Sequence, residues 1–260
     1  MASVRDRALS IVELLAHHVR GLPMSEIADT LGIPRTATHR LLADLKDTGY
    51  VKQHAGSTQY TLTVKLASLG LAYLAATGIT DAAQPLLDDL AEHCGELVRL
   101  TIVEGNQLIW VAKAQGARRG LRYDPDTGHD IYLPATANGL CWLASVSEER
   151  ALELVTLQGL DRAKDYGPGA PRTLRGLMEQ VEATRERGYA MAFDIYEAGT
   201  SAMATVVRLA GSQDVIGSVS IAGPTTRMTR ERMEAMAPAL QACAEALALA
   251  SKGSPMFSKR

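Results

Sequence analysis

The chain has 260 residues, of which 47% are apolar and 22% are charged, and it carries a net charge of −2. It contains no run of about 18 apolar residues and no apolar core behind its charged N-terminus, so we expect a cytoplasmic protein without a membrane span or signal peptide. Its three cysteines stand far apart and match no metal-ligand spacing, which predicts buried thiols and neither a metal nor another cofactor.

The charges are divided unevenly along the chain. Residues 1–65 hold 8 Lys and Arg against 6 Asp and Glu, a balance of +2, whereas residues 66–260 hold 19 against 23, a balance of −4. A basic N-terminal part on an acidic body is the sign expected of a protein that binds nucleic acid through its N-terminal end. The difference is small, so charge alone does not identify the function.

The N-terminal part predicts three short helices. Apolar residues recur at helical spacing within residues 8–16 and again within residues 25–31. Gly32 permits the sharp end that the second helix needs. Pro34 suits the first turn of a third helix, which runs to about Thr48. The second and third helices are therefore joined by a tight turn.

A β-hairpin is predicted directly after the third helix. Residues 50–53 and 59–62 alternate in polarity like strands, and the polar stretch 54–58 between them is a turn by composition. Two helices, a tight turn, a third helix and a hairpin follow one another in the winged helix-turn-helix. The sequence therefore predicts a DNA-binding domain of this kind over residues 1–65.

The third helix of such a domain lies in the major groove, where Arg, Thr and His side chains can donate hydrogen bonds to phosphates and base edges. A lone basic helix is more often a solvated face. Here the tight turn before the helix and the hairpin after it favour DNA binding. The residues predicted to contact DNA from the helix and the wing are Arg35, Thr36, Thr38, His39, Arg40, Lys52 and His54.

The remainder of the chain alternates between helices and strands. Residues 64–77 predict an apolar helix that ends at Gly78, which we interpret as a linker helix that needs a partner surface such as another subunit. We expect an α+β fold, with domain boundaries at 1–65, 66–79 for the linker helix and 80–253 for the larger domain. Further helices are predicted over 81–94, 136–144, 148–157, 174–187 and 229–251, and strands over 97–103, 108–114, 202–208 and 215–222.

Several segments, in their order and spacing, resemble the IclR family, which is named after the isocitrate lyase regulator. The resemblance covers nearly the whole chain, and no single segment is decisive. It rests on residues 7–15, 25–28, 32–42 and 49–51 in the N-terminal domain and on 85–91, Leu133, 135–137, 187–190, 217–224 and Leu240 in the larger one.

The resemblance implies a transcription regulator, either a dimer or a dimer of dimers, that binds a palindromic operator in double-stranded DNA. It implies a GAF-like C-terminal domain that binds a small-molecule effector, often an organic or aromatic acid. Members of the family repress or activate transcription, so the sign of regulation stays open.

By the same resemblance, the effector pocket is lined by residues 135–140, by residues 192–203 and by the strand 218–222. The period of two within that strand places Ser218, Ser220 and Ala222 on one face. Free N–H groups at the start of the helix near Thr136 favour an anion. The residues predicted to bind the effector are Arg122, Thr136, Ala137, Asn138, Asp194, Thr200, Ala202, Ser218, Ser220 and Ala222.

The chain departs from the family at several of these positions, where residues that are commonly polar are replaced. The replacements are Pro134 for His, Leu140 for Lys, Ala202 for Cys, and Ala192 and Phe193 for acidic residues. They make the pocket more apolar, with Trp110, Phe193 and Met203 available as walls, so we favour an aromatic or partly apolar ligand over an acid of glyoxylate size. Plain core packing is an equally good interpretation of any single one of these residues.

The densest basic cluster outside the N-terminal domain consists of Arg118, Arg119 and Arg122. A solvated strand edge explains such a cluster in most proteins. The sharper hypothesis makes Arg122 the counter-ion of an acidic effector.

Two other functions compete with the regulator. An enzyme is disfavoured because the chain lacks a nucleophile elbow, a zinc-protease motif, a P-loop and a dinucleotide fingerprint, and only His93 and His129 remain for chemistry in the larger domain. The second competitor is a DNA-binding scaffold that senses nothing and whose C-terminal domain only oligomerises, which the apolar linker and closing helices fit equally well.

Overall fold

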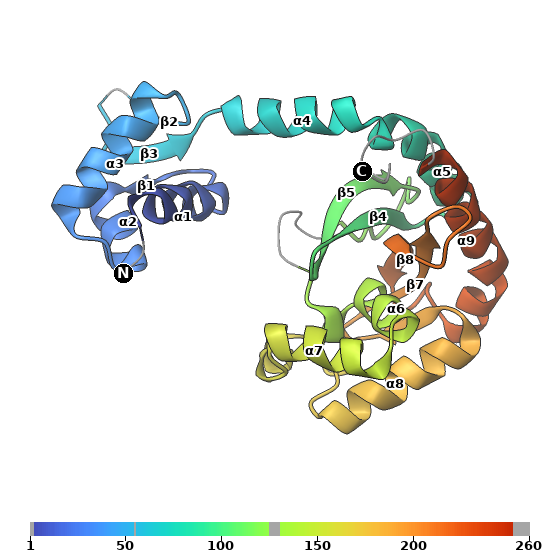
Figure 1. The fold of residues 1–260 in the computed structure, drawn as a ribbon. Coiled ribbons are helices and arrows are strands. Elements are labelled where there is room, and N and C mark those ends of the chain that lie inside the picture. Colours follow the sequence, from blue (N-terminus) through green and yellow to red (C-terminus); the bar gives the residue numbers. More distant parts are fainter. Residues whose placement is uncertain (1–2, 55, 125–130, 252–260) are drawn as a thin grey trace. The chain divides into compact units, whose positions relative to one another are not determined.

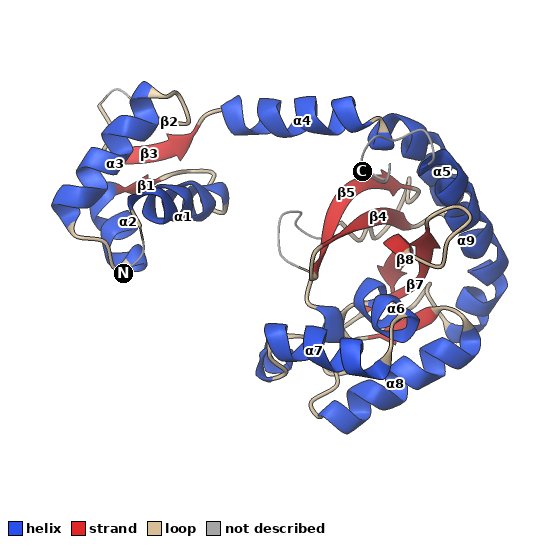
Figure 2. Cartoon of the chain, in the orientation of Figure 1, coloured by secondary structure: helices blue, strands red, loops and turns tan. Residues whose placement is uncertain are grey.

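The fold is taken from a computed structural model that describes residues 3–54, 56–124 and 131–251. Its contacts divide the chain into two compact units, Met1–Ala76 and Thr77–Arg260. Both units contain helices and a sheet (Figure 2), so the fold is α+β as predicted. Among the described residues no single helix is long and apolar enough to cross a membrane, although Lys65–Thr77 and Asp81–Cys94 pass that test of length and composition together as a bent pair.

The smaller unit begins with three helices around a compact apolar core. Ser3 and Asp6 form a capping box that fixes the start of the first helix. Gly32 ends the second helix with a φ of 61°, the left-handed conformation that the sequence predicts there. The largest fully buried side chains of this core are those of Ile11, Leu15, Ile27 and Leu42. The helices are α1 (Val4–Ala16), α2 (Met24–Leu31) and α3 (Arg35–Asp47).

A small antiparallel sheet completes this unit. The predicted hairpin is present, formed by β2 (Val51–Gln53) and β3 (Gln59–Leu62). A third strand, β1 (Leu22–Pro23), pairs with β3 and was not predicted, because two residues are too few to show a period. The strand order is β1-β3-β2, which is the wing of a winged helix-turn-helix.

Helix α4 (Lys65–Thr77) follows the wing, and all of it except Thr77 belongs to the smaller unit. It covers the stretch predicted to be a linker helix. Three of its leucines are exposed, with 39% of the surface of Leu66, 49% of that of Leu69 and 68% of that of Leu71 accessible. Exposed apolar side chains gathered on one helix commonly mark an interaction surface.

The described part of the larger unit is built on a five-stranded antiparallel sheet with the strand order β5-β4-β8-β7-β6. Four of the strands correspond to the predicted ones. The third strand in chain order, β6, was not predicted because it is short and lacks clear alternation. The strands are β4 (Leu97–Glu104), β5 (Gln107–Gln115), β6 (Ala190–Phe193), β7 (Thr200–Arg208) and β8 (Val215–Pro224).

Helices cover both faces of this sheet (Figure 1). One face packs against α5 and α9 through a core that includes Leu87, Met203 and Leu240. The other face packs against α6 and α8 through a core that includes Leu140 and Leu177. The helices are α5 (Ile79–Cys94), α6 (Ala137–Ser145), α7 (Glu148–Gln158), α8 (Leu174–Arg187) and α9 (Arg230–Ala250), with 3-10 turns η1 (Leu133–Ala135) and η2 (Asp161–Asp165).

Candidate functional sites

One face of α3 carries polar and basic side chains that are free of the core. Arg35, Thr36, His39 and Arg40 are all exposed. Thr36, His39 and Arg40 are spaced three and four residues apart, so they lie on one face of the helix. Lys52 and His54 are exposed on the wing that follows. The arrangement presents donors from a helix and a wing of one small unit, as reading a DNA groove requires.

Thr38 is the exception among the predicted DNA-contacting residues. Its side chain is fully buried, and its hydroxyl donates to the backbone oxygens of Ile33 and Pro34 at 3.4 and 3.3 Å. Thr38 lies three and four residues before Leu41 and Leu42, so it shares their buried face. The prediction that it contacts DNA is therefore wrong, since it helps to close the turn before α3.

The larger unit contains a pocket of about 670 Å³, part of which is open to solvent. Residues from all five strands of the sheet line this pocket. Ala192, Ala202 and Ala222 stand opposite one another on β6, β7 and β8, and they form a row of small side chains. Ser220 of β8 lies opposite Arg99 of β4. The alanine row leaves a flat space above the sheet, bordered by hydrogen-bonding groups.

The start of α6 closes the pocket from the other side. Thr136 caps this helix by accepting a hydrogen bond from the Gly139 N–H at 3.0 Å. Ala137 and Asn138 occupy its first turn and line the pocket. The first N–H groups of a helix point out of its end and favour negative charge. This end of the pocket therefore suits an anionic group.

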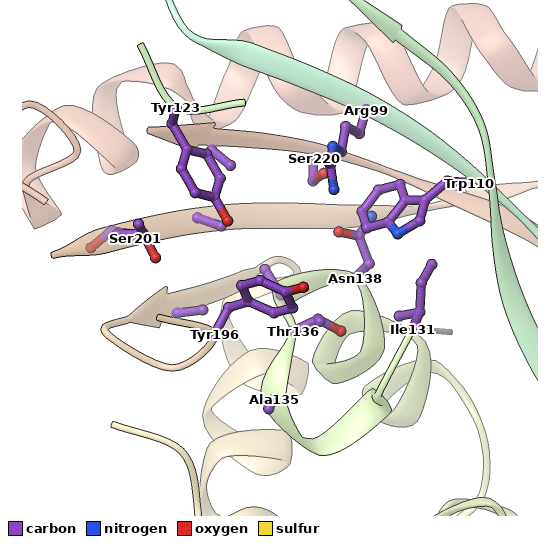
Figure 3. Close-up of a pocket in the computed structure, with 15 residues that line it drawn as sticks. Arg99, Trp110, Tyr123, Ile131, Ala135, Thr136, Asn138, Tyr196, Ser201 and Ser220 are labelled. Atoms are coloured by element: carbon purple, nitrogen blue, oxygen red, sulfur yellow. The ribbon is translucent and has the colours of Figure 1, made fainter. Parts of the chain in front are cut away.

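Aromatic side chains border the remaining space. Tyr123 and Tyr196 approach it from opposite sides, and Trp110 lies at the end near Arg99 (Figure 3). Burial raises the pKa of Tyr123 to about 12, while nearby Arg99 and a hydrogen bond with Thr200 oppose this shift. The phenol is therefore neutral at physiological pH and can donate a hydrogen bond.

Arg99 is the charged group of this pocket. Its side chain is buried, and the guanidinium carbon lies 4.5 Å from the centre of the Trp110 ring. Burial lowers the pKa of Arg99, yet a guanidinium keeps its proton in proteins. Sequence reasoning missed this residue. The signal was a charged residue in the middle of an apolar strand, because a buried charge needs a partner.

A buried hydrogen-bonded group lies beside the pocket. The Asn138 amide donates to the Ser218 hydroxyl at 2.9 Å, and that hydroxyl lies 2.7 Å from the hydroxyl of Thr101. Ser218 thus faces the same side of the sheet as Ser220, as predicted, but its hydroxyl is occupied by protein partners. It is placed to orient Asn138 and does not line the pocket.

Two other predicted effector residues also lie outside the pocket lining. Arg122 is 54% exposed at its side chain and pairs with Asp124 at 3.0 Å, which corresponds to the solvated alternative. Asp194 accepts from the Gly199 N–H at 2.6 Å and so closes the loop that carries Tyr196. The predicted residues that do line the pocket are Thr136, Ala137, Asn138, Thr200, Ala202, Ser220 and Ala222.

Of the three predicted apolar walls, only Trp110 lines the pocket. Met203 is buried in the core on the opposite face of the sheet. Phe193 packs against that same core and lies under the guanidinium of Arg230 at 5.3 Å. Both predictions fail because alternate residues of a strand face opposite sides. His129 lies outside the described residues, and within the described ranges no cluster of His, Cys, Asp or Glu is suited to a metal ion.

The sequence matches known families over both units. Residues 5–55 match the family described as the IclR helix-turn-helix domain, and residues 71–249 match the bacterial transcriptional regulator IclR C-terminal family. The chain is 24% identical over 229 residues to the transcriptional repressor IclR of Escherichia coli K12, covering 87% of this chain and 82% of that protein. It is 28% identical over 236 residues to the regulator BhcR of Paracoccus denitrificans, covering 90% and 82%.

Solved structures share the fold. An IclR transcriptional regulator from Alicyclobacillus acidocaldarius superposes with a TM-score of 0.82 at 24% identity, covering 96% of this chain and 99% of that one. An IclR homologue from Microbacterium hydrocarbonoxydans, crystallised with 4-hydroxybenzoate, gives a TM-score of 0.79 at 19% identity, covering 97% and 100%. At these identities the likeness concerns the fold.

The family matches decide between DNA binding and catalysis as the function of the chain. The matched families and the named relatives are regulators of transcription, so the enzyme is rejected. The exposed face of α3 and the wing fit this conclusion. The chain belongs to the IclR family and is a DNA-binding transcriptional regulator.

Proposed function

We propose that the larger unit is a GAF-like effector domain whose pocket binds a small aromatic carboxylate, and that this ligand controls binding of the operator. The observation that carries the proposal is the buried Arg99 stacked on Trp110 inside the pocket. A buried guanidinium favours a carboxylate partner, because the pair can form charge-assisted hydrogen bonds away from water. The indole holds the guanidinium at the edge of the space that a ring would fill.

The shape of the pocket supports an aromatic ring. The row Ala192, Ala202 and Ala222 leaves a flat floor, and Tyr123 and Tyr196 offer ring faces and edges for stacking. The relative from Microbacterium hydrocarbonoxydans, which binds 4-hydroxybenzoate, gives this ligand class further support.

We assign operator contacts to the exposed residues Arg35, Thr36, His39 and Arg40 of α3, with Lys52 and His54 on the wing contacting backbone. We also propose that a second copy of the chain covers the exposed leucines of α4. A dimer would present two DNA-reading helices to a palindromic site, with half-sites about one helical turn apart or a multiple of it. Light scattering of the full chain tests the dimer directly.

A thermal-unfolding panel tests the ligand class. A ligand that binds only the folded state stabilises it by about 2.7 kcal/mol at a hundredfold excess over its Kd. We expect 4-hydroxybenzoate and similar aromatic carboxylates to raise the Tm of the wild-type chain and of the control variant Arg118→Gln, whose side chain pairs with Glu92 outside the pocket lining. Stabilisation by glyoxylate-sized aliphatic acids alone would contradict the proposal.

The scaffold without an effector is the remaining alternative. Its larger unit would only oligomerise, and the polar groups of the pocket would have no ligand. The alternative predicts that no small acid changes the Tm or the affinity for operator DNA. The position of Arg99 and Trp110 in the pocket lining, together with the start of α6, favours the effector domain, because these groups suit an anionic aromatic ligand.

A further inference from the structure

Three consecutive backbone oxygens directly after α3 accept hydrogen bonds from Thr63, which precedes α4, and from Lys65, its first residue. The oxygen of Thr48 accepts from the Lys65 ammonium at 2.6 Å. The oxygen of Gly49 accepts from the Thr63 hydroxyl at 2.6 Å, and that of Tyr50 from the Thr63 N–H at 2.9 Å. The end of the DNA-reading helix is thus hydrogen-bonded to the start of α4, although the whole wing lies between them in the sequence.

Thr63 and Lys65 make further contacts at this junction. The Thr63 hydroxyl also accepts from the Lys65 N–H at 3.2 Å, so it joins the end of one helix to the beginning of the next. The Lys65 ammonium lies 4.5 Å from the centre of the Tyr50 ring. Its charge at the C-terminal end of α3 is favourable, because the unpaired carbonyls there carry partial negative charge. We call these contacts of Thr63 and Lys65 the α3–α4 clasp.

The end of α3 is itself rigid. The N–H of Tyr50 donates to Leu45 and that of Gly49 donates to Lys46, both at 2.9 Å. Gly49 has a φ of 78°, so this is a Schellman ending. The clasp therefore joins α4 to a fixed structure, and a rotation of the first turn of α4 must either break the clasp or turn α3 with it.

We propose that Thr63 and Lys65 are positioning residues that make α3 and the start of α4 move as one body, so that a displacement of α4 changes how the DNA-reading helix is presented. The inference rests on the proposed function in that it takes α3 as the element that contacts the operator. A loose junction would absorb such a displacement in the chain between the wing and the helix. The clasp removes that freedom.

Spin labels test, without DNA, whether α3 and the start of α4 move as one body. Nitroxides on Ala43→Cys and Ser68→Cys, both exposed sites on α3 and α4, report the distance between the two helices. The three native cysteines are buried, and dilution with unlabelled protein removes distances between chains. We expect a narrow distance distribution in the wild-type background and in Lys164→Met, a control that removes an exposed charge elsewhere. Thr63→Val and Lys65→Met should broaden the distance distribution. A distribution as narrow as that of the wild type in both variants overturns the proposal.

Operator spacing tests the functional part. We expect the wild-type chain to lose about tenfold in affinity when one base pair is inserted between half-sites. Thr63→Val and Lys65→Met should bind both spacings equally well, and each should bind a single half-site as the wild type does. Lys65→Arg should discriminate between the two spacings again. A uniform loss on every duplex, with a salt slope smaller by about one, would make Lys65 a phosphate contact and overturn the proposal. If the wild type binds no operator, the proposed function fails, and the spin-label result still decides the clasp.

Discussion

The guanidinium of Arg99 lies 4.5 Å from the centre of the Trp110 ring, and both side chains line the same pocket. Neighbouring strands hold the pair, Arg99 on β4 and Trp110 on β5. A cation on an aromatic face is stabilised without losing its ability to donate in the plane of the guanidinium. The pair thus presents a fixed positive charge next to an apolar surface, which is the combination that an aromatic carboxylate requires.

Replacing this charge should remove the effector response. Arg99→Gln keeps a polar side chain but loses the charge, and hydrogen bonds to a charged group contribute about 1.5–3 kcal/mol. We expect the Kd for 4-hydroxybenzoate, measured by titration calorimetry, to rise about tenfold or more. Arg122→Gln should bind the ligand as the wild type does, because Arg122 pairs with Asp124 outside the pocket lining. A raised Kd in Arg122→Gln and an unchanged Kd in Arg99→Gln would instead make Arg122 the counter-ion of the ligand.

Two threonines on α3 should respond differently to the same substitution. Thr36 is exposed on the proposed DNA face, so Thr36→Val should lower operator affinity by about 1 kcal/mol or more, roughly fivefold. Thr38 is buried and bonded to the backbone, so Thr38→Val should lower the free energy of unfolding by about 1 kcal/mol and leave operator affinity unchanged. Anisotropy titrations and urea unfolding of both variants separate these effects.

Two glutamates form a matched pair for stability. Glu96 is 1% exposed at its side chain and binds Arg227 at 2.6 Å and Arg232 at 3.3 Å. Glu96→Gln should cost about 3 kcal/mol, the lower end for breaking a buried pair, because the two guanidinium side chains are 32% and 37% exposed. Glu92 pairs with Arg118 on the surface, so Glu92→Gln should cost less than about 1 kcal/mol. Equal losses in urea unfolding would contradict this difference.

The thiols should be inert at neutral pH. Burial raises the pKa of Cys94 and Cys243 to about 11 and that of Cys141 to about 12. The thiolate is the reactive form, so a thiol reagent at pH 8 should label the folded chain only after urea is added. Fast labelling of any of the three in the folded chain would contradict the burial.

The same thiols give the chain an alkaline limit. Unfolded thiols lose their protons near the ordinary value of 9.0, whereas the folded ones keep them. The unfolded state then binds fewer protons, so the free energy of unfolding should fall as pH rises from about 9 towards 11, by up to about 1.4 kcal/mol per pH unit for each thiol. Urea unfolding at pH 8 and pH 10 measures the loss, and equal stability at both would contradict it.

Local patterns were sufficient for most of the fold. Gly32 and the helical spacing around it located α2 and α3, and α8 begins and ends where the sequence predicts. Short elements such as β1 and β6 were missed because two or four residues show no period. The burial of Thr38 could have been predicted, because the spacing that turns Leu41 and Leu42 inward includes Thr38.

The pocket was harder to predict because its residues come from distant parts of the sequence. Arg99 and Ser220 become neighbours only through the pairing of β4 with β8. Tyr123 and Tyr196 lie in loops, where no period indicates which way a side chain points. Alternation did place Ser218 and Ser220 on one face, but it did not show that Asn138 and Thr101 occupy the hydroxyl of Ser218.

The most direct test of the account is the affinity of the full chain for a duplex from its own upstream region, measured by anisotropy with and without 4-hydroxybenzoate. We predict that the ligand changes the Kd of the wild type about fivefold or more, the size of a typical coupling between two sites, and leaves that of Arg99→Gln unchanged. An operator Kd of the wild type that no aromatic carboxylate changes would contradict the account.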